Sequence, residues 1–128
     1  MSAQEQELFA LAKEARENAY APYSDFKVGA AILGESGTIY LGCNVENASF
    51  GLTVCAERVA LFKALSEGER VFKAIAIYAG SKSVPPCGAC LQVMAEFGDL
   101  DILLFDSKGS YVKWRISELL PQAFRLND

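Results

Sequence analysis

Two short motifs hold three cysteines and a glutamate whose types and spacing suit a catalytic metal site. They are Cys55-Ala56-Glu57-Arg58 and Pro86-Cys87-Gly88-Ala89-Cys90, and each stands where a helix is predicted to begin. Cys-x-x-Cys at a helix start brings two sulfurs within reach of one ion, and the unpaired backbone N–H groups there favour thiolates. Cys55 can supply a third sulfur. Three protein ligands and one open position are what a catalytic zinc site requires.

The residues that follow Cys55 add a candidate acid–base group and a candidate counter-charge. Glu57 lies two residues further on, close to the metal but displaced from it. Its carboxylate could therefore take a proton from a metal-activated water without becoming a ligand. Arg58 could donate hydrogen bonds to the thiolates and offset their excess negative charge, although a surface helix arginine is the plain alternative.

A structural zinc site is the competing interpretation of the same cysteines. Structural sites usually have four ligands, and the sequence contains no histidine. Cys43 is therefore the one cysteine left to complete such a site. It falls on a predicted strand directly after Gly42, which favours a small core residue instead.

The motifs need elements that bring two helix starts together. Ser2-Ala3-Gln4-Glu5 is typical of a capping box and predicts a helix that runs to about Tyr20. Strands are predicted over 27–34, 38–43, 72–79, 102–105 and 111–116, the last as an edge strand. Helices are predicted from Cys55 to a stop at Gly68, over 87–97, and from residue 117. This order predicts one domain over residues 1–128, a mixed sheet with helices on its faces.

Composition limits the partners and the compartment. The formal charge of −4 and the pI near 4.9 argue against a nucleic-acid partner. No apolar run is long enough to span a bilayer, and the polar, acidic N-terminus does not resemble a signal peptide. We therefore expect a cytoplasmic protein without a membrane partner, in which the four cysteines stay reduced.

Further strings make the chain similar to a known family. These strings are Pro22-Tyr23-Ser24-x-Phe26-x-Val28-Gly29-Ala30-Ala31, Gly42-Cys43-Asn44-Val45-Glu46-Asn47-Ala48-Ser49 and Leu119-Leu120-Pro121-x-x-Phe124. Together with the two motifs, they resemble the small homotetrameric, zinc-dependent cytidine deaminases of the cytidine/deoxycytidylate deaminase family. The resemblance covers nearly the whole chain. The resemblance implies an α/β fold with three layers, α-β-α, and a mixed five-stranded sheet with helices on both faces.

The resemblance also implies an activity. Cytidine and 2′-deoxycytidine would be hydrolysed to uridine and 2′-deoxyuridine plus ammonia, as in pyrimidine salvage. One zinc ion per chain would be bound by Cys55, Cys87 and Cys90. Glu57 would shuttle the proton between the zinc-activated water and the base, and Arg58 would support the thiolates.

Substrate contacts are implied by the same likeness. Asn44 and Glu46 would hydrogen-bond the ribose, Phe26 would pack on the pyrimidine ring, and the Ala56 backbone would hold the ring carbonyl. Each pocket would be completed by neighbouring subunits of a homotetramer, with Phe50 and Phe124 reaching into a neighbour's site.

The chain departs from the family at one position. Many relatives have Arg where this chain has Leu91, which would leave Arg58 with more of the charge compensation.

Three other functions are alternatives to this activity. They are a deaminase of a modified cytosine nucleoside of the blasticidin S type, a polynucleotide deaminase, and a non-catalytic zinc-stabilised module. The acidic balance disfavours the polynucleotide enzyme. An intact acid–base residue beside an open metal site has no structural purpose, which disfavours the non-catalytic module.

Overall fold

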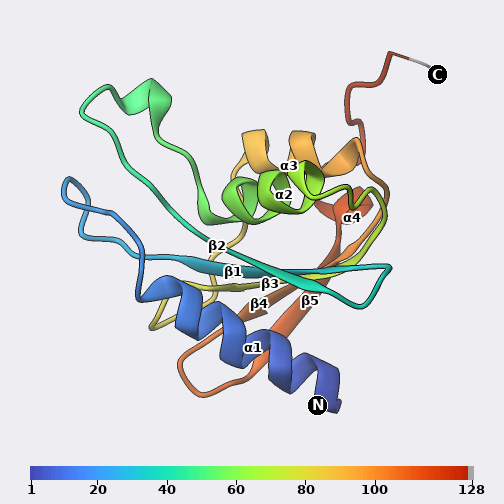
Figure 1. The fold of residues 1–128 in the computed structure, drawn as a ribbon, viewed down its shortest axis with the longest axis horizontal. Helices are drawn as coiled ribbons and strands as arrows, with labels where there is room; N and C mark the ends of the chain where they lie inside the picture. Colours follow the sequence, from blue (N-terminus) through green and yellow to red (C-terminus); the bar gives the residue numbers. More distant parts are fainter. Residues whose placement is uncertain (127–128) are drawn as a thin grey trace.

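A five-stranded mixed sheet forms the middle layer of the computed structural model, which describes residues 1–126 (Figure 1). The strands lie in the order β2-β1-β3-β4-β5. Only β3 and β4 run parallel, and every other neighbouring pair is antiparallel. Their bounds are Gly29–Gly34 for β1, Ile39–Cys43 for β2, Phe72–Tyr78 for β3, Asp101–Phe105 for β4 and Tyr111–Arg115 for β5.

Helices cover both faces of the sheet, as the sequence predicts. Helix α1 (Ala3–Arg16) packs on one face, and α2 (Ala56–Ser66) and α3 (Gly88–Ala95) pack on the other, near the short α4 (Ile116–Leu119) (Figure 1). Separate apolar clusters fill the two sides. Leu8 and Phe105 lie in the cluster under α1, and Leu61 and Ile102 lie in the cluster under α2 and α3. The three-layer α/β fold is therefore confirmed.

Helix α1 begins at the predicted capping box but ends earlier than expected. The Ser2 hydroxyl accepts the Glu5 N–H, and the Glu5 carboxylate accepts the Ser2 N–H. The helix stops at Arg16 and not near Tyr20. Tyr20 instead donates its N–H to the Asn44 carbonyl and accepts the Glu46 N–H. These backbone bonds pull the chain away from the helix axis, toward the segment that carries two of the predicted site residues.

The strands also differ slightly from their predicted bounds. β1 begins at Gly29 and not at residue 27, because the backbone of the preceding residues bonds to the Asn44 side chain. β5 lies at the edge of the sheet, as its alternating pattern predicts. The predicted domain boundaries run to residue 128, and residues 127–128 lie outside the described part of the chain. No helix within residues 1–126 is both long and apolar enough to span a membrane.

Two glycines let the helices lie directly on the strands. A Cβ atom at Gly42 on β2 would be 2.3 Å from the Ala60 nitrogen and 2.6 Å from the Ala56 carbonyl oxygen of α2. A Cβ atom at Gly29 on β1 would be 2.0 Å from the Ala12 carbonyl oxygen of α1. These close approaches fix both helices on the sheet, and α2 carries the first of the two chemical motifs.

Candidate metal centre and active-site pocket

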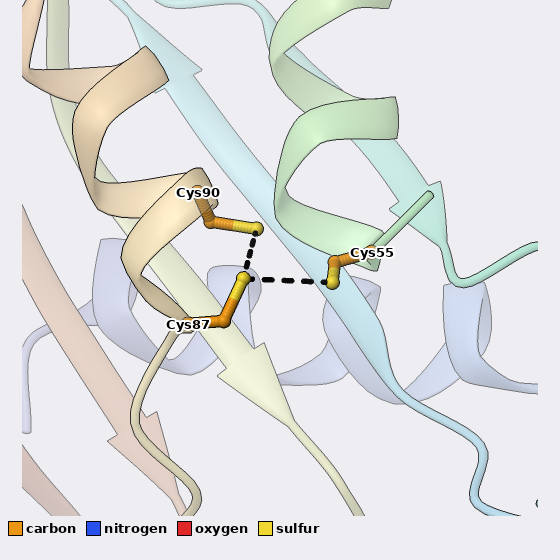
Figure 2. Close-up of side chains that lie close together, drawn as sticks. All are labelled: Cys55, Cys87 and Cys90. Carbon is orange, nitrogen blue, oxygen red and sulfur yellow. Dashed lines mark hydrogen bonds between the residues drawn. The ribbon is translucent and has the colours of Figure 1, made fainter. Parts of the chain in front are cut away.

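The first residues of α2 and α3 bring three sulfurs together. Cys55 is the N-cap of α2, Cys87 is the N-cap of α3, and Cys90 lies in the first turn of α3. The Sγ atoms of Cys55 and Cys87 are 3.9 Å apart, and those of Cys87 and Cys90 are 3.5 Å apart (Figure 2). All three lie within 4.8 Å of one another. Neither N-cap cysteine uses its side chain to cap its helix, so both sulfurs remain free to bind a metal.

This geometry fits a zinc ion. Tetrahedral zinc with Zn–S bonds of about 2.3 Å separates its sulfur ligands by about 3.8 Å, close to the observed spacing. Thiolates are also the donors that zinc prefers in tetrahedral protein sites. Cys43, the only other cysteine, lies on β2 and is not part of this cluster. It is partly exposed and not a fully buried core residue. The cluster therefore has no fourth protein sulfur, and a tetrahedral ion held by these three cysteines would keep one position for a non-protein ligand.

Arg58 lies beside the sulfurs, as expected for a residue that compensates their charge. Its Nη2 is 3.7 Å from the Cys55 sulfur. Its Nε is buried and has no hydrogen-bond partner among the described residues. A hydrogen bond from Cys90, together with bonds from Arg58 and Cys87, lowers the pKa of Cys55 to about 5. The reciprocal bond with Cys55, followed by burial, raises the pKa of Cys90. Arg58 and the neighbouring sulfurs thus favour the thiolate form of Cys55.

Glu57 is a buried carboxyl group beside this cluster. It lies in the first turn of α2 and is 5% exposed. Burial raises its pKa to about 7, and the negative charge of Cys55 acts in the same direction. A carboxyl group that titrates near neutral pH can both accept and release a proton during one reaction cycle.

The cluster opens into a pocket of about 290 Å³. The pocket is lined by Cys55, Glu57 and Cys87 and by all four predicted contacts with the base and the sugar, which are Phe26, Asn44, Glu46 and Ala56. No lysine or arginine lines it, and the ionisable groups in its lining are the carboxyl groups of Glu46 and Glu57 and the sulfurs of Cys55 and Cys87. Ser24, Thr53, Val84 and Pro85 also line the pocket. These four residues were not predicted from the sequence, although the closeness of Val84 and Pro85 to Cys87 along the chain is a signal that indicates them.

Asn44 and Glu46 hold the pocket wall through their side chains. Asn44 Oδ1 accepts the Val28 N–H at 2.9 Å, and Asn44 Nδ2 donates to the Phe26 carbonyl at 2.8 Å. The Glu46 carboxylate accepts the N–H groups of Tyr23 and Ser24 and the hydroxyl of Ser24. The hydroxyl and N–H bonds from Ser24 lower the pKa of Glu46. Both side chains thus shape the segment that carries Phe26.

Phe50 and Phe124 lie away from this pocket. Phe50 begins the 3₁₀ helix Phe50–Leu52, is 77% exposed, and lies edge-on to Tyr23 with 6.3 Å between ring centroids. It lines a neighbouring pocket of about 320 Å³ that shares Ser24, Glu46 and Thr53 with the first. Phe124 is 67% exposed.

The Phe124 backbone is held in place although its ring is exposed. Its N–H donates to Gln92 Oε1, and its carbonyl accepts from Gln92 Nε2, at 3.1 and 2.9 Å. Gln92 lies on α3, two residues after Cys90. The sequence carried no signal for this contact, because Gln92 and Phe124 are far apart along the chain.

Comparisons with known proteins agree with this site. The family described as the cytidine and deoxycytidylate deaminase zinc-binding region matches residues 2–105. A protein named cytidine deaminase from Sporosarcina psychrophila is 52% identical over 126 residues, which are 96% of this chain and 93% of that protein. Another of that name from Halalkalibacterium halodurans is 55% identical over 118 residues, covering 90% and 89%. The crystal structure of cytidine deaminase from Burkholderia pseudomallei superposes with a TM-score of 0.89 at 49% identity, covering 97% of this chain and all of that one.

Proposed function

Because the chain belongs to the cytidine and deoxycytidylate deaminase family, we propose that it hydrolyses cytidine and 2′-deoxycytidine to the uridine forms and ammonia. The observation that carries this proposal is a pocket lined by a buried carboxyl group, Glu57, and by two sulfurs of the three-cysteine cluster, Cys55 and Cys87. The same pocket contains an aromatic ring and polar side chains suited to a base and a sugar. A role in pyrimidine salvage follows from the reaction itself.

Zinc is the cofactor that the site fits, with Cys55, Cys87 and Cys90 as its protein ligands. When bound there, it supplies Lewis-acid activation of the water that attacks C4 of the cytosine ring. Arg58 stabilises the ligands in their thiolate form by hydrogen bonding and by its charge. We expect one ion per chain.

Glu57 carries the protons in the proposed reaction. It accepts one proton from the attacking water and delivers it to N3 of the ring. It then takes the remaining proton of the same water and passes it to the amino group, which leaves as ammonia. The two protons of water thus end on N3 and on ammonia, and C4 becomes the carbonyl of uridine. The raised pKa of Glu57 makes both directions of transfer accessible near neutral pH.

Four other residues orient the substrate in this proposal. Phe26 packs against the pyrimidine ring, and the Ala56 backbone holds the ring carbonyl. Asn44 and Glu46 receive the ribose hydroxyls with the hydrogen-bonding capacity that their contacts to the chain leave unused. An ionised carboxylate has about four acceptor positions, and Glu46 uses three of them within the protein.

The pocket favours a nucleoside over a nucleotide. Recognition of a phosphate group normally uses arginine, lysine or a helix N-terminus. The pocket has no arginine or lysine, and Glu46 stands where the sugar is expected. The N-termini of α2 and α3 carry the cysteine cluster, so they are not free to bind a phosphate group. A 5′-phosphate would therefore meet uncompensated negative charge.

We also propose that the chain forms a homotetramer in which neighbours complete each pocket. Phe50 and Phe124 are exposed aromatic rings whose backbone groups are hydrogen-bonded, Phe50 to Thr53 and Phe124 to Gln92. Tyr23, whose ring lies edge-on to that of Phe50, and Leu52, in the same 3₁₀ helix as Phe50, add exposed apolar surface beside it, and exposed apolar patches mark interaction sites. The cytoplasm is the compartment we propose, because zinc binding by these thiols requires that they stay reduced.

The test is substrate discrimination by the zinc-loaded protein. Uridine and ammonia are measured with cytidine, 2′-deoxycytidine and 2′-deoxycytidine 5′-monophosphate as alternative substrates. We expect both nucleosides to be turned over and the nucleotide to have a kcat/KM at least about 100-fold lower. Preference for the monophosphate would contradict the proposed substrate class, and turnover of none of them would contradict the proposed activity.

A further inference from the structure

Arg16, the last residue of α1, lies outside the pocket but contacts two segments that form its wall. Its Nε donates to the Lys27 carbonyl at 2.9 Å. Its guanidinium carbon lies 5.7 Å from the centroid of the Tyr78 ring. Its Nη2 also lies 2.9 Å from the position that a Cβ atom would take at Gly80. One guanidinium group thus joins the chain before β1 to the chain after β3.

Both of these segments line the pocket. Lys27 stands between Phe26 and Val28, and both of those residues line it. Tyr78 ends β3, and Gly80 lies in the connection that continues through Val84 and Pro85, two further lining residues. Gly80 has a φ of 105°, a left-handed conformation that glycine adopts without strain. The absent side chain leaves the space that the Arg16 guanidinium occupies.

The Arg16 backbone is itself packed against the sheet. A Cβ atom at Gly29 would lie 2.5 Å from the Arg16 nitrogen, so the end of α1 rests directly on the start of β1. The ion pairs found among residues 1–126 do not include Arg16. Its bonding groups therefore serve a backbone carbonyl and an aromatic face and not a carboxylate.

We propose that Arg16 is a positioning residue that holds the two segments at a fixed separation and so sets the width of the substrate pocket. This inference rests on the proposed function. The guanidinium is suited to the task because its Nε donates to a backbone carbonyl while its charge lies over an aromatic ring. A lysine at the same position keeps the charge but has no Nε donor and no plane.

The closing experiment compares three variants of the zinc-loaded protein. Arg16→Met removes the guanidinium, and Arg16→Lys keeps the charge. Lys13→Met is the matched control, because Lys13 lies on the same helix, and its ammonium is 5.2 Å from the Phe9 ring centroid. Lys13 does not line the pocket. We measure KM and kcat for cytidine, melting temperature, zinc per chain, and amide hydrogen exchange in peptides covering residues 24–29 and 79–87.

The positioning role predicts looser walls and weaker substrate binding with intact chemistry. For Arg16→Met we expect KM to rise about tenfold with kcat within about threefold of wild type and zinc unchanged. Exchange should accelerate in both peptides, and Arg16→Lys should show the same changes to a smaller degree. Lys13→Met should match wild type in all of these. If Arg16→Met does not fold, Arg16→Lys is judged by the same measurements.

Two results would overturn the inference. One is KM and exchange in the Arg16 variants equal to those of Lys13→Met. The other is a lower melting temperature with less active protein and an unchanged KM, which is what a purely structural role predicts. An inactive wild-type protein would instead contradict the proposed function, and the exchange measurement would then decide the inference alone.

Discussion

Replacing Gly42 by alanine should displace helix α2, which carries the proposed proton shuttle Glu57, and reduce activity far more than stability alone explains. The added Cβ would lie 2.3 Å from the Ala60 nitrogen and 2.6 Å from the Ala56 carbonyl oxygen. Non-bonded heavy atoms approach to about 3.5 Å, so α2 must move from β2 by about 1 Å. The first turn of α2 holds Cys55 and Glu57. A misplacement of about 1 Å can cost about 100-fold in rate.

The assay is kcat/KM for cytidine, measured with zinc per chain and melting temperature. We expect Gly42→Ala to lose about 100-fold in kcat/KM. Gly68→Ala is the control, because Gly68 follows the far end of the same helix, has a φ of 97°, and has no atoms within 4 Å of an added Cβ. Its strain costs roughly 1–2 kcal/mol of stability without pushing the first turn. A Gly42→Ala protein that keeps kcat/KM within about threefold of wild type would refute the reasoning.

Three further predictions concern charge, metal binding and the neighbouring subunit. In metal-free protein, Glu57→Gln should raise the free energy of unfolding by about 3 kcal/mol above pH 7, because burial raises the pKa of Glu57 from 4.5 to about 7 and so disfavours its charged form. Between these two pH values folded wild-type protein binds one proton more than the unfolded chain, so its stability relative to the variant falls as pH rises. Urea unfolding at pH 4.5 to 8 measures this, with exposed Glu67→Gln as control. A difference in unfolding free energy between wild type and Glu57→Gln that does not change with pH would disprove it. Arg58→Ala should weaken zinc binding about 10- to 100-fold in a competition titration with a chelator, and an unchanged affinity would argue against its role beside the thiolates. Gln92→Ala should release the Phe124 backbone and raise KM severalfold with zinc content unchanged, whereas an unchanged KM would show that the position of Phe124 does not matter to the substrate.

The sequence predicted the elements that local patterns define. The Ser2–Glu5 capping box fixed the start of α1, and the alternation over 111–116 identified the edge strand. The three cysteines that the motifs select do lie together, because the starts of α2 and α3 meet in the fold. The assigned roles of the site residues stay predictions until substrate is tested.

What the sequence did not predict depends on contacts between distant segments. Three features show this. Helix α1 ends at Arg16, where the chain turns toward the Asn44 segment. The Asn44 amide bonds to the backbone of Phe26 and Val28, and Gln92 bonds to the Phe124 backbone. Periodicity cannot indicate such pairs. The burial of Leu91 was also not predicted from the sequence, and Leu91 is 7% exposed in the core under α2 and α3. An arginine there would need a buried partner, so Leu91→Arg tests burial before it tests charge compensation.

The proton transfer by Glu57 is tested most directly by one measurement on two proteins. Wild-type protein and Glu57→Gln are each loaded with zinc, the bound metal is quantified, and uridine formation from cytidine is followed. We predict one zinc per chain in both proteins and a loss of at least about 1,000-fold in kcat for the variant, since general acid–base catalysis typically contributes about 100- to 10,000-fold. A zinc-loaded Glu57→Gln protein that retains kcat within tenfold of wild type would contradict the account.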